Sequence, residues 1–176
     1  MEVSEKPLTH LKPLNQSNTQ ELHQLIESNR SYLREWLPWL DNITAISDTA
    51  IFIESISCLA SAPHFGVFHD GKLCGIAGFH EIKPKVKVAS IGYWLAQNQV
   101  GKGITSAAVQ ELLEIGLQKL KLERIEIRCA KGNVKSRSVA QGLGFTYVKT
   151  LPNNEWLYDK YVDHVVYSKK LDYESI

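Results

Sequence analysis

A short glycine-rich stretch, VGKGIT at residues 100–105, is the part of this sequence best suited to bind a phosphate group. It lies where a run of apolar residues ends and a helical pattern begins. The first amides of a helix lack partners inside the helix, the helix dipole attracts anions, and glycine lets an anion approach the backbone. The stretch therefore predicts a diphosphate-binding turn formed by Val100, Gly101, Lys102, Gly103, Ile104 and Thr105.

Two other glycine-rich phosphate motifs do not fit this stretch. A P-loop requires glycine and then serine or threonine at positions where this chain has Ala96 and Gly103. A dinucleotide-binding fingerprint requires a third glycine or alanine where Ser106 stands, and an acidic residue where Cys129 and Ala130 close the next strand. On this motif alone, an ordinary strand-to-helix turn without a ligand remains the alternative.

A second stretch, NVKSRSVAQGLGF at residues 133–145, begins with polar side chains three residues apart. Asn133 and Ser136 stand at the start of a predicted helix, where asparagine and serine are both favoured as N-caps. Helix capping is therefore one interpretation of the pair. A role in binding or chemistry is the other.

The periodicity of apolar residues predicts the elements that must position these stretches. Asp70-Gly71 between two alternating stretches predicts a tight hairpin, and Ser47 or Asp48 is a candidate N-cap for a helix. The predicted strands are Leu8 to Leu14, two strands within 64–82, and four more at 87–96, 124–130, 144–151 and 161–171. The predicted helices lie within 18–40, after residue 47, at 101–120 and at 133–143. This order predicts an α+β fold in which helices cover both faces of a mixed sheet.

Length and composition limit the classes of protein to consider. The 176 residues fit one domain, 1–176, and 20 basic against 19 acidic residues give no electrostatic reason to expect nucleic acid or a membrane as partner. The N-terminus lacks the order of a signal peptide and no apolar run is long, so we expect a cytoplasmic protein. Cys58, Cys74 and Cys129 are odd in number and flanked by apolar residues, which predicts buried, reduced thiols.

Three stretches in one order resemble the GNAT superfamily and, within it, the enzymes that acetylate ribosomal-protein N-termini at serine or alanine. They are NRSYLREWLPWLDN with the following DTAIFI, then IGYWLAQNQVGKGITSAAVQELL, and finally NVKSRSVAQGLGF. Together with the predicted sheet they span nearly the whole chain. The resemblance implies the GNAT acyl-CoA N-acyltransferase fold, with a mixed, mostly antiparallel sheet of six to seven strands, and acetyl-CoA as co-substrate without a metal.

The resemblance assigns the diphosphate of acetyl-CoA to the backbone amides of the glycine-rich stretch. This chain departs from the common pattern at Val100, where glutamine or arginine is frequent, and at Thr105, where glycine or alanine is frequent. The strand that ends at Trp94 and Leu95 is implied to separate from the next parallel strand. Free backbone groups there would pair with pantetheine, and an amide near Leu95 would hold the thioester oxygen. For the side chains of Tyr93 and Trp94, core packing is the alternative.

The resemblance also implies roles on both sides of the transfer. Asn133 matches a position that holds the coenzyme A arm, and Ser136 matches a serine that protonates the leaving thiolate, because the usual tyrosine is Ala140 here. On the amine side, GFHEI places His80 and Glu81 at the end of a central strand. Strand alternation predicts that only one of them faces the site. Glu81 is the preferred general base or amine-binding group and His80 the second choice, and either can instead be a solvated strand-end residue.

The expected reaction is direct transfer of an acetyl group to an amine, most simply the α-amine of a ribosomal or other protein. An α-amine with a pKa of about 7.7 to 8.0 needs less base catalysis than a lysine amine near 10.4. Trp36 and Trp39 are predicted to form a wall beside the acceptor, with core packing or a subunit contact as alternatives. Acetylation of a small-molecule amine, such as a polyamine, an antibiotic or an amino acid, stays open, as do a catalytically inactive coenzyme-A-binding protein and a homo-oligomer.

Overall fold

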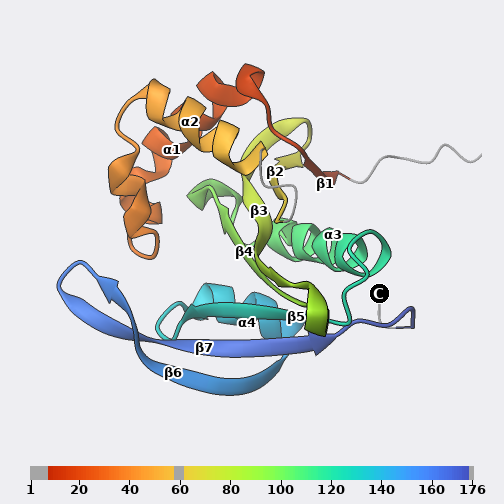
Figure 1. Ribbon diagram of the computed structural model, residues 1–176. Coiled ribbons are helices and arrows are strands. Elements are labelled where there is room, and N and C mark those ends of the chain that lie inside the picture. The colour runs from red at the N-terminus through yellow and green to blue at the C-terminus, as the bar shows by residue number, and fades with distance from the viewer. Residues whose placement is uncertain (1–7, 58–61, 175–176) are drawn as a thin grey trace, which may run out of the picture.

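A sheet of seven strands in the order β1-β2-β3-β4-β5-β7-β6 forms the centre of the protein. The computed structural model describes residues 8–57 and 62–174. The strands are β1 Thr9–Lys12, β2 His64–His69, β3 Lys72–Lys83, β4 Val88–Leu95, β5 Arg124–Ala130, β6 Thr146–Leu157 and β7 Lys160–Lys170. β4 and β5 pair in parallel and the other neighbouring strands pair antiparallel, which confirms the predicted mixed sheet and α+β class (Figure 1).

Helices cover both faces of this sheet. The α-helices are α1 Thr19–Leu33, α2 Ile46–Ser57, α3 Ile104–Gln118 and α4 Val134–Gly142, with short 3₁₀ turns η1 Gln16–Asn18, η2 Pro38–Asn42, η3 Pro84–Val86 and η4 Gln97–Gln99. One buried cluster joins Ile91 and Ile127 of the sheet to Leu112 of α3, whereas a second joins Ile76 to α1 and α2. We call these the α3 face and the α1 face of the sheet.

The central helix α3 shows why the predicted pattern folds as it does. Its buried residues recur at helical spacing and are Ile104, Ala108, Val109, Leu112, Leu113, Gly116 and Leu117. Such a stripe must pack against another apolar surface, and the α3 face of the sheet supplies it. Packing of this stripe holds the first turn of α3 at the ends of the central strands.

Several predicted boundaries differ from the observed ones. The helical pattern within 18–40 ends at Leu33, and the helix predicted at 101–120 begins at Ile104, because Gly101 and Gly103 have left-handed backbone angles. Ser47 and Asp48 are not N-caps. Their helix begins at Ile46. The Asp48 carboxylate accepts hydrogen bonds from the backbone amides of Thr44 and Ala45, at 3.0 and 2.8 Å.

The predicted hairpin turn and two of the predicted buried thiols are confirmed. Asp70 and Gly71 have φ angles of +50° and +75°, as a tight hairpin turn requires. Cys74 and Cys129 are buried free thiols, whereas Cys58 lies outside the described residues. None of the helices in the described ranges is long and apolar enough to cross a membrane.

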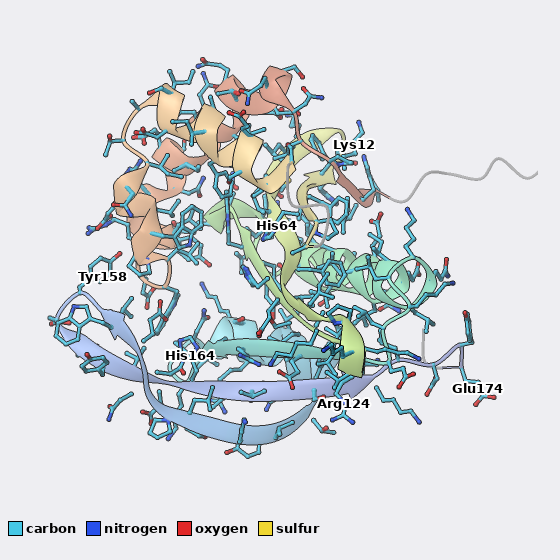
Figure 2. The ribbon with its side chains drawn as sticks, in the orientation of Figure 1. Lys12, His64, Arg124, Tyr158, His164 and Glu174 are labelled. Atoms are coloured by element: carbon cyan, nitrogen blue, oxygen red, sulfur yellow. The ribbon has the colours of Figure 1, made fainter. Side chains whose placement is uncertain are left out.

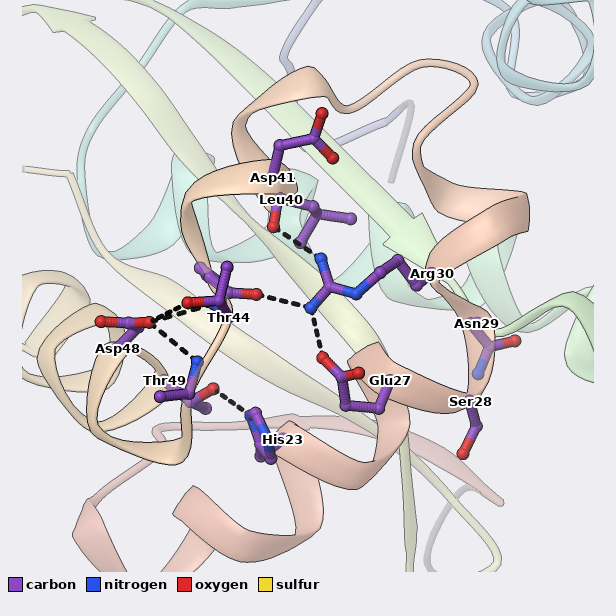
Figure 3. Close-up of polar contacts among 12 residues, drawn as sticks. His23, Glu27, Ser28, Asn29, Arg30, Leu40, Asp41, Thr44, Asp48 and Thr49 are labelled. Atoms are coloured by element: carbon purple, nitrogen blue, oxygen red, sulfur yellow. Dashed lines mark hydrogen bonds and ion pairs between the residues drawn. The ribbon is translucent and has the colours of Figure 1, made fainter.

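A polar network fixes the turn that follows α1. Arg30 donates to the carbonyl oxygens of Leu40 and Ile43 and pairs with Glu27 (Figure 3). Because this guanidinium spans the turn from α1 to η2, it holds η2 against the helix. The C-terminal end of α1 therefore has a defined position over the sheet.

Candidate functional site

The site begins where β4 loses its parallel neighbour. Pairing of β4 with β5 extends to Ile91 opposite Ile127, whereas pairing with β3 continues to Leu95. The Ala96 amide donates to Cys74 of β3 at 2.8 Å, so the preceding amide, that of Leu95, points to the opposite edge. A backbone edge is thus open toward β5, and it begins directly after Ile91, a little before the position that the sequence predicted.

The glycine turn follows this open edge. Gly101 and Gly103 have φ angles of +81° and +76°, which glycine adopts without strain. The Ala107 amide makes the first bond of α3, to the Gly103 carbonyl oxygen, so the amides of the preceding turn are free for a ligand. The Lys102 ammonium group donates to the Gln99 side chain at 3.1 Å, so it is held against the preceding η4 turn.

A cavity of about 600 Å³ joins the glycine turn, the open edge of β4, the start of α4 and the end of α1. It is lined by residues 32–33, 35–37, 93–95, 99–101, 103–106, 132–136 and 138–139. Ligand pockets in proteins have volumes of about 300–1,000 Å³. The cavity brings together most of the predicted cofactor-binding residues, namely Trp94, Leu95, Val100, Gly101, Gly103, Ile104, Thr105, Asn133 and Ser136, and leaves out Lys102.

The start of α4 places two polar side chains in the cavity wall. The Asn133 side chain accepts a hydrogen bond from the Ser136 amide at 3.2 Å, so it caps α4 and lines the cavity at once. The Ser136 hydroxyl donates to Tyr93 Oη at 3.3 Å, and Tyr93 Oη donates to the Ser136 carbonyl oxygen at 3.1 Å. Burial raises the pKa of the Tyr93 phenol, which therefore stays protonated near neutral pH.

The two predicted bases lie on the α1 face of the sheet and do not line the cavity. A bulge in β3 between Phe79 and Glu81 interrupts strand alternation, so His80 and Glu81 lie on the same face of the sheet, contrary to the predicted alternation. His80 lies over Gly92, where an added Cβ would come within 1.9 Å of its Nε2. Glu81 lies 3.9 Å from Arg128 on the same face.

His80 and Glu81 differ in their surroundings. The His80 ring meets the His64 ring edge-on, with centroids 5.4 Å apart. Desolvation lowers the pKa of the His80 imidazole, and His64 lowers it further, although part of the residue is open to solvent. Glu81 is half exposed and lies within 4.0 Å of the cations of Lys83 and Arg128, at 3.6 and 3.9 Å. His80 is therefore neutral near neutral pH, whereas Glu81 belongs to a surface ion-pair group.

The end of α1 forms one wall of the cavity. Trp36 lines it and packs on Gly132, where an added Cβ would lie 3.1 Å from the indole. The Lys135 ammonium group lies 4.9 Å from the Tyr32 ring centroid, which links α4 to α1. Trp39 does not line this cavity and stacks on Phe52 of α2, so its predicted place beside the acceptor stays a prediction.

Two polar contacts near the site were not predicted from the sequence. His164 of β7 and Glu155 of β6 form a pair at 2.8 Å, and His164 lies opposite Ala130 at the end of β5. At the tip of the β6–β7 hairpin, Tyr158 donates to the Arg34 carbonyl oxygen at 2.6 Å (Figure 2). A local sequence pattern cannot reveal these pairs. Tyr158 and Arg34 lie far apart in the chain, and the pairing of β6 with β7 is irregular between Leu151 and Glu155.

The described residues hold no group of three or more His, Cys, Asp or Glu side chains that could bind a metal ion. Burial raises the pKa of the Cys129 thiol, and a hydrogen bond with Ser136 partly offsets this effect. Burial likewise raises the pKa of Cys74. Both thiols are therefore poor nucleophiles near neutral pH, which favours direct transfer over an acyl-cysteine intermediate.

Sequence comparison relates the chain to acetyltransferases. Residues 9–146 match the family model described as an acetyltransferase (GNAT) domain. A ribosomal-protein-serine acetyltransferase of Escherichia coli (strain K12) is 33% identical over 166 residues, which cover 93% of this chain and 88% of that protein.

Comparison with solved structures gives the same relationship. RimL, a ribosomal L7/L12 alpha-N-protein acetyltransferase in complex with coenzyme A, superposes with a TM-score of 0.90 at 28% identity, over 95% of this chain and 96% of that chain. The microcin C7 self-immunity acetyltransferase MccE, in complex with acetyl-CoA and AMP, superposes with a TM-score of 0.89 at 30% identity, over 94% of this chain and 93% of that chain. The similarity thus covers nearly the whole chain in both sequence and fold.

Proposed function

The chain belongs to the GNAT acetyltransferase family, and we propose that it transfers the acetyl group of acetyl-CoA to the α-amine of a protein N-terminus. The observation that carries this proposal is the cavity that runs from the free amides of the glycine turn to the open edge of β4. The amides of the glycine turn suit the anionic diphosphate of acetyl-CoA, and the open edge of β4 suits its extended pantetheine arm.

The residues of the cavity suit acetyl-CoA in their chemistry. The first amides of α3, after Gly103, offer hydrogen bonds and the positive end of a helix dipole to the diphosphate. The open edge of β4 offers backbone groups to the amides of pantetheine. The Leu95 amide points into the strand gap, where it can donate to the thioester oxygen as negative charge develops on it.

The amine acceptor approaches from the α1 face, where His80 is our first choice for the base. His80 lies on Gly92, the first residue of β4 beyond the last β4–β5 pair, and its lowered pKa keeps it neutral. A neutral imidazole can take a proton from the acceptor ammonium group before attack, or from the amine nitrogen as it bonds to the acetyl carbon, directly or through water. The Glu155–His164 pair, on the β5 side of the same face, is the second candidate. Glu81 is then an amine-binding or surface residue.

A protein N-terminus is the proposed acceptor for two reasons. An α-amine is about one-tenth neutral at pH 7, so one modest base is enough. The 33% identical relative is named for acetylating serine on a ribosomal protein. A small-molecule amine is the alternative acceptor, because the similarly close structural neighbour MccE confers self-immunity to microcin C7.

Thiol release from acetyl-CoA tests the proposal directly. The acceptor panel should contain peptides that begin with serine or alanine, the same peptides blocked at the N-terminus, free lysine and a polyamine. We expect release with the free peptides and none with the blocked ones. Release with the small amines alone would support the alternative acceptor, and tight coenzyme binding without release would indicate an inactive binding protein.

A further inference from the structure

Two hydroxyl groups meet in the cavity wall where β4 faces the start of α4. Tyr93 and Ser136 are joined by two hydrogen bonds, one from the serine hydroxyl to Tyr93 Oη at 3.3 Å and one from Tyr93 Oη to the serine carbonyl oxygen at 3.1 Å. Both residues line the cavity. The polar end of a largely buried tyrosine is therefore bound to a single residue of α4.

This contact complements the N-cap of α4. Asn133 holds the Ser136 amide, while Tyr93 contacts the carbonyl oxygen and the hydroxyl of the same serine. Ser136 is thus held through its backbone and its side chain from two sides. Further along α4, Ala140 is fully buried, so that position offers no polar group to the cavity.

We infer that Tyr93 is a positioning residue for the leaving group: its hydroxyl holds Ser136 so that the serine can donate to the sulfur of coenzyme A. The inference rests on the proposed function. The role differs from the core packing that the sequence alone suggested for this tyrosine. Tyr93 acts through Ser136 and does not itself touch the sulfur.

The step balances in atoms and charge. The amine nitrogen bonds to the acetyl carbon, the carbon–sulfur bond breaks, and its electron pair remains on sulfur. Ser136 gives its proton to the sulfur and recovers one from water, while the proton of the amine leaves through the base on the α1 face. For this step the Tyr93 hydroxyl turns from the Ser136 carbonyl oxygen to Ser136 Oγ. Tyr93 keeps its own proton, because burial raises its pKa.

Other titratable groups also face Ser136. Cys129 of β5 makes a hydrogen bond with it, and burial keeps this thiol protonated near neutral pH. Arg137 of α4 acts on Cys129 through its charge, and its guanidinium donates to Tyr167 Oη at 3.1 Å and to the Lys131 carbonyl oxygen at 3.0 Å. Tyr167 is a buried tyrosine bonded to α4 outside the cavity lining, so Tyr167→Phe is a matched control for Tyr93→Phe.

A double-mutant cycle tests the coupling of the two hydroxyls. With saturating acceptor, we expect Tyr93→Phe to lower kcat about 10-fold and Ser136→Ala about 100-fold, with KM for acetyl-CoA unchanged within about two-fold. The double variant should match Ser136→Ala alone, and Tyr167→Phe should keep the wild-type kcat. The inference would be overturned if Tyr93→Phe did not lower kcat. It would also be overturned if Tyr93→Phe lowered kcat in the Ser136→Ala background as much as in the wild type.

Binding of coenzyme A provides a readout that needs no acceptor and no turnover. If the pair stabilises a thiolate, the affinity for coenzyme A relative to desulfo-coenzyme A should rise between about pH 7 and about pH 10 in calorimetry. In Tyr93→Phe this rise should be about 10-fold smaller. The Cys129→Ala background removes the neighbouring thiol from the titration. An equal rise in wild type and Tyr93→Phe would refute the role of Tyr93, whereas an enzyme that shows the difference but no turnover would refute only the proposed function.

A fold-preserving variant covers the case in which Tyr93→Phe is unstable. Substitution of 3-fluorotyrosine at position 93 keeps the ring and the hydroxyl. We expect it to retain about half or more of the wild-type kcat, because the hydrogen bonds remain. A loss of about 10-fold there would contradict the inference.

Discussion

At the scale of single residues, our proposal reverses the order of the two predicted bases. A base must be deprotonated before it accepts a proton, and it must lie near the reacting atoms. His80 meets both conditions, because its pKa is lowered and its ring lies on Gly92 at the strand gap. Glu81 has two cations within 4.0 Å and belongs to the exposed ion-pair group of the α1 face.

This exchange predicts different losses for two amide substitutions. We expect His80→Gln to lower kcat about 100-fold and Glu81→Gln to lower it less than about three-fold, because only the imidazole takes the proton. Steady-state kinetics with a serine-starting peptide measures both. Comparable losses in the two variants would restore Glu81 as a candidate base.

The pH dependence of the rate follows from the same group. His80 loses its activity as a base when it is protonated, and its pKa lies below the ordinary 6.5. We therefore expect kcat to be constant near neutral pH and to fall as the pH drops below 6.5 toward the lowered pKa. In His80→Gln this acidic limb should disappear. If it remained unchanged, the Glu155–His164 pair would become the first candidate.

At the scale of elements, the glycine turn depends on two left-handed residues at the start of α3. Gly103 has a φ of +76°, and an added Cβ would meet nothing within 4 Å, so strain alone opposes alanine. Gly71, in the hairpin far from the cavity, has a φ of +75° and equally open surroundings. The two positions therefore share the backbone strain, whereas of the two only Gly103 lines the cavity.

This pair of glycines separates stability from binding. Gly103→Ala and Gly71→Ala should each lower the free energy of unfolding by about 1–2 kcal/mol, because alanine is strained at positive φ. Only Gly103→Ala should weaken acetyl-CoA binding, by about 10-fold, as the first amides of α3 shift. Urea unfolding and calorimetry measure the two effects. Equal coenzyme affinity in both variants would argue against the turn as the diphosphate site.

The β6–β7 hairpin meets the end of α1 through a small clasp, defined here as Tyr158, Arg34 and Asp41. The Tyr158 hydroxyl donates to the Arg34 carbonyl oxygen at 2.6 Å, and the Arg34 guanidinium lies 5.0 Å from the Tyr158 ring centroid. Arg34 also binds Asp41 with two hydrogen bonds, at 2.6 and 2.9 Å. The clasp links the tip of the β6–β7 hairpin, where Figure 2 labels Tyr158, to the end of α1.

Loosening the clasp should affect the acceptor more than the coenzyme. We expect Tyr158→Ala to raise KM for the peptide about five-fold and to leave KM for acetyl-CoA unchanged, because the wall of the acceptor side loses its order. Trp156→Ala is a suitable control, because Trp156 lies on the same hairpin, is exposed and packs its ring on Tyr161. Similar kinetics in both variants would show that the clasp does not order the acceptor side.

At the scale of the whole molecule, the His64–His80 pair links stability to pH. Burial lowers the pKa of His64, and desolvation lowers that of His80. Just below pH 6.5 these two histidines therefore bind more protons in the unfolded chain than in the folded chain. The contribution of this pair to stability is therefore fully present above pH 6.5 and is lost as the pH falls toward the lowered pKa values. Carboxylates such as Asp48 have lowered pKa values and lose their contribution only in more acidic solution.

Urea unfolding across this range should show the effect. The free energy of unfolding should be lower at about pH 5 than at about pH 8, and His64→Asn/His80→Asn should reduce that difference, because the groups that titrate are gone. An undiminished difference in the double variant would assign the effect to other groups.

Much of this molecule follows from local patterns in its sequence. Apolar periodicity determined the α+β class, the hairpin at Asp70-Gly71 and the stripe of α3, because side chains repeat on one face of a strand or helix. The glycine turn could be located in the same way, since its backbone angles restrict the residue type. The acetyltransferase family followed from three local stretches in their order.

Only the tertiary structure decided which side chains meet. The bulge at His80, the hydrogen bonds between Tyr93 and Ser136, and the pairs formed by the β6–β7 hairpin depend on register and on contacts between distant parts of the chain. A shift of one residue in a strand reverses the face of every following side chain, so spacing in the sequence cannot fix such contacts. The register decides which side chains meet on the α1 face, whereas the turn at residues 100–105 is set by the local conformation of its glycines.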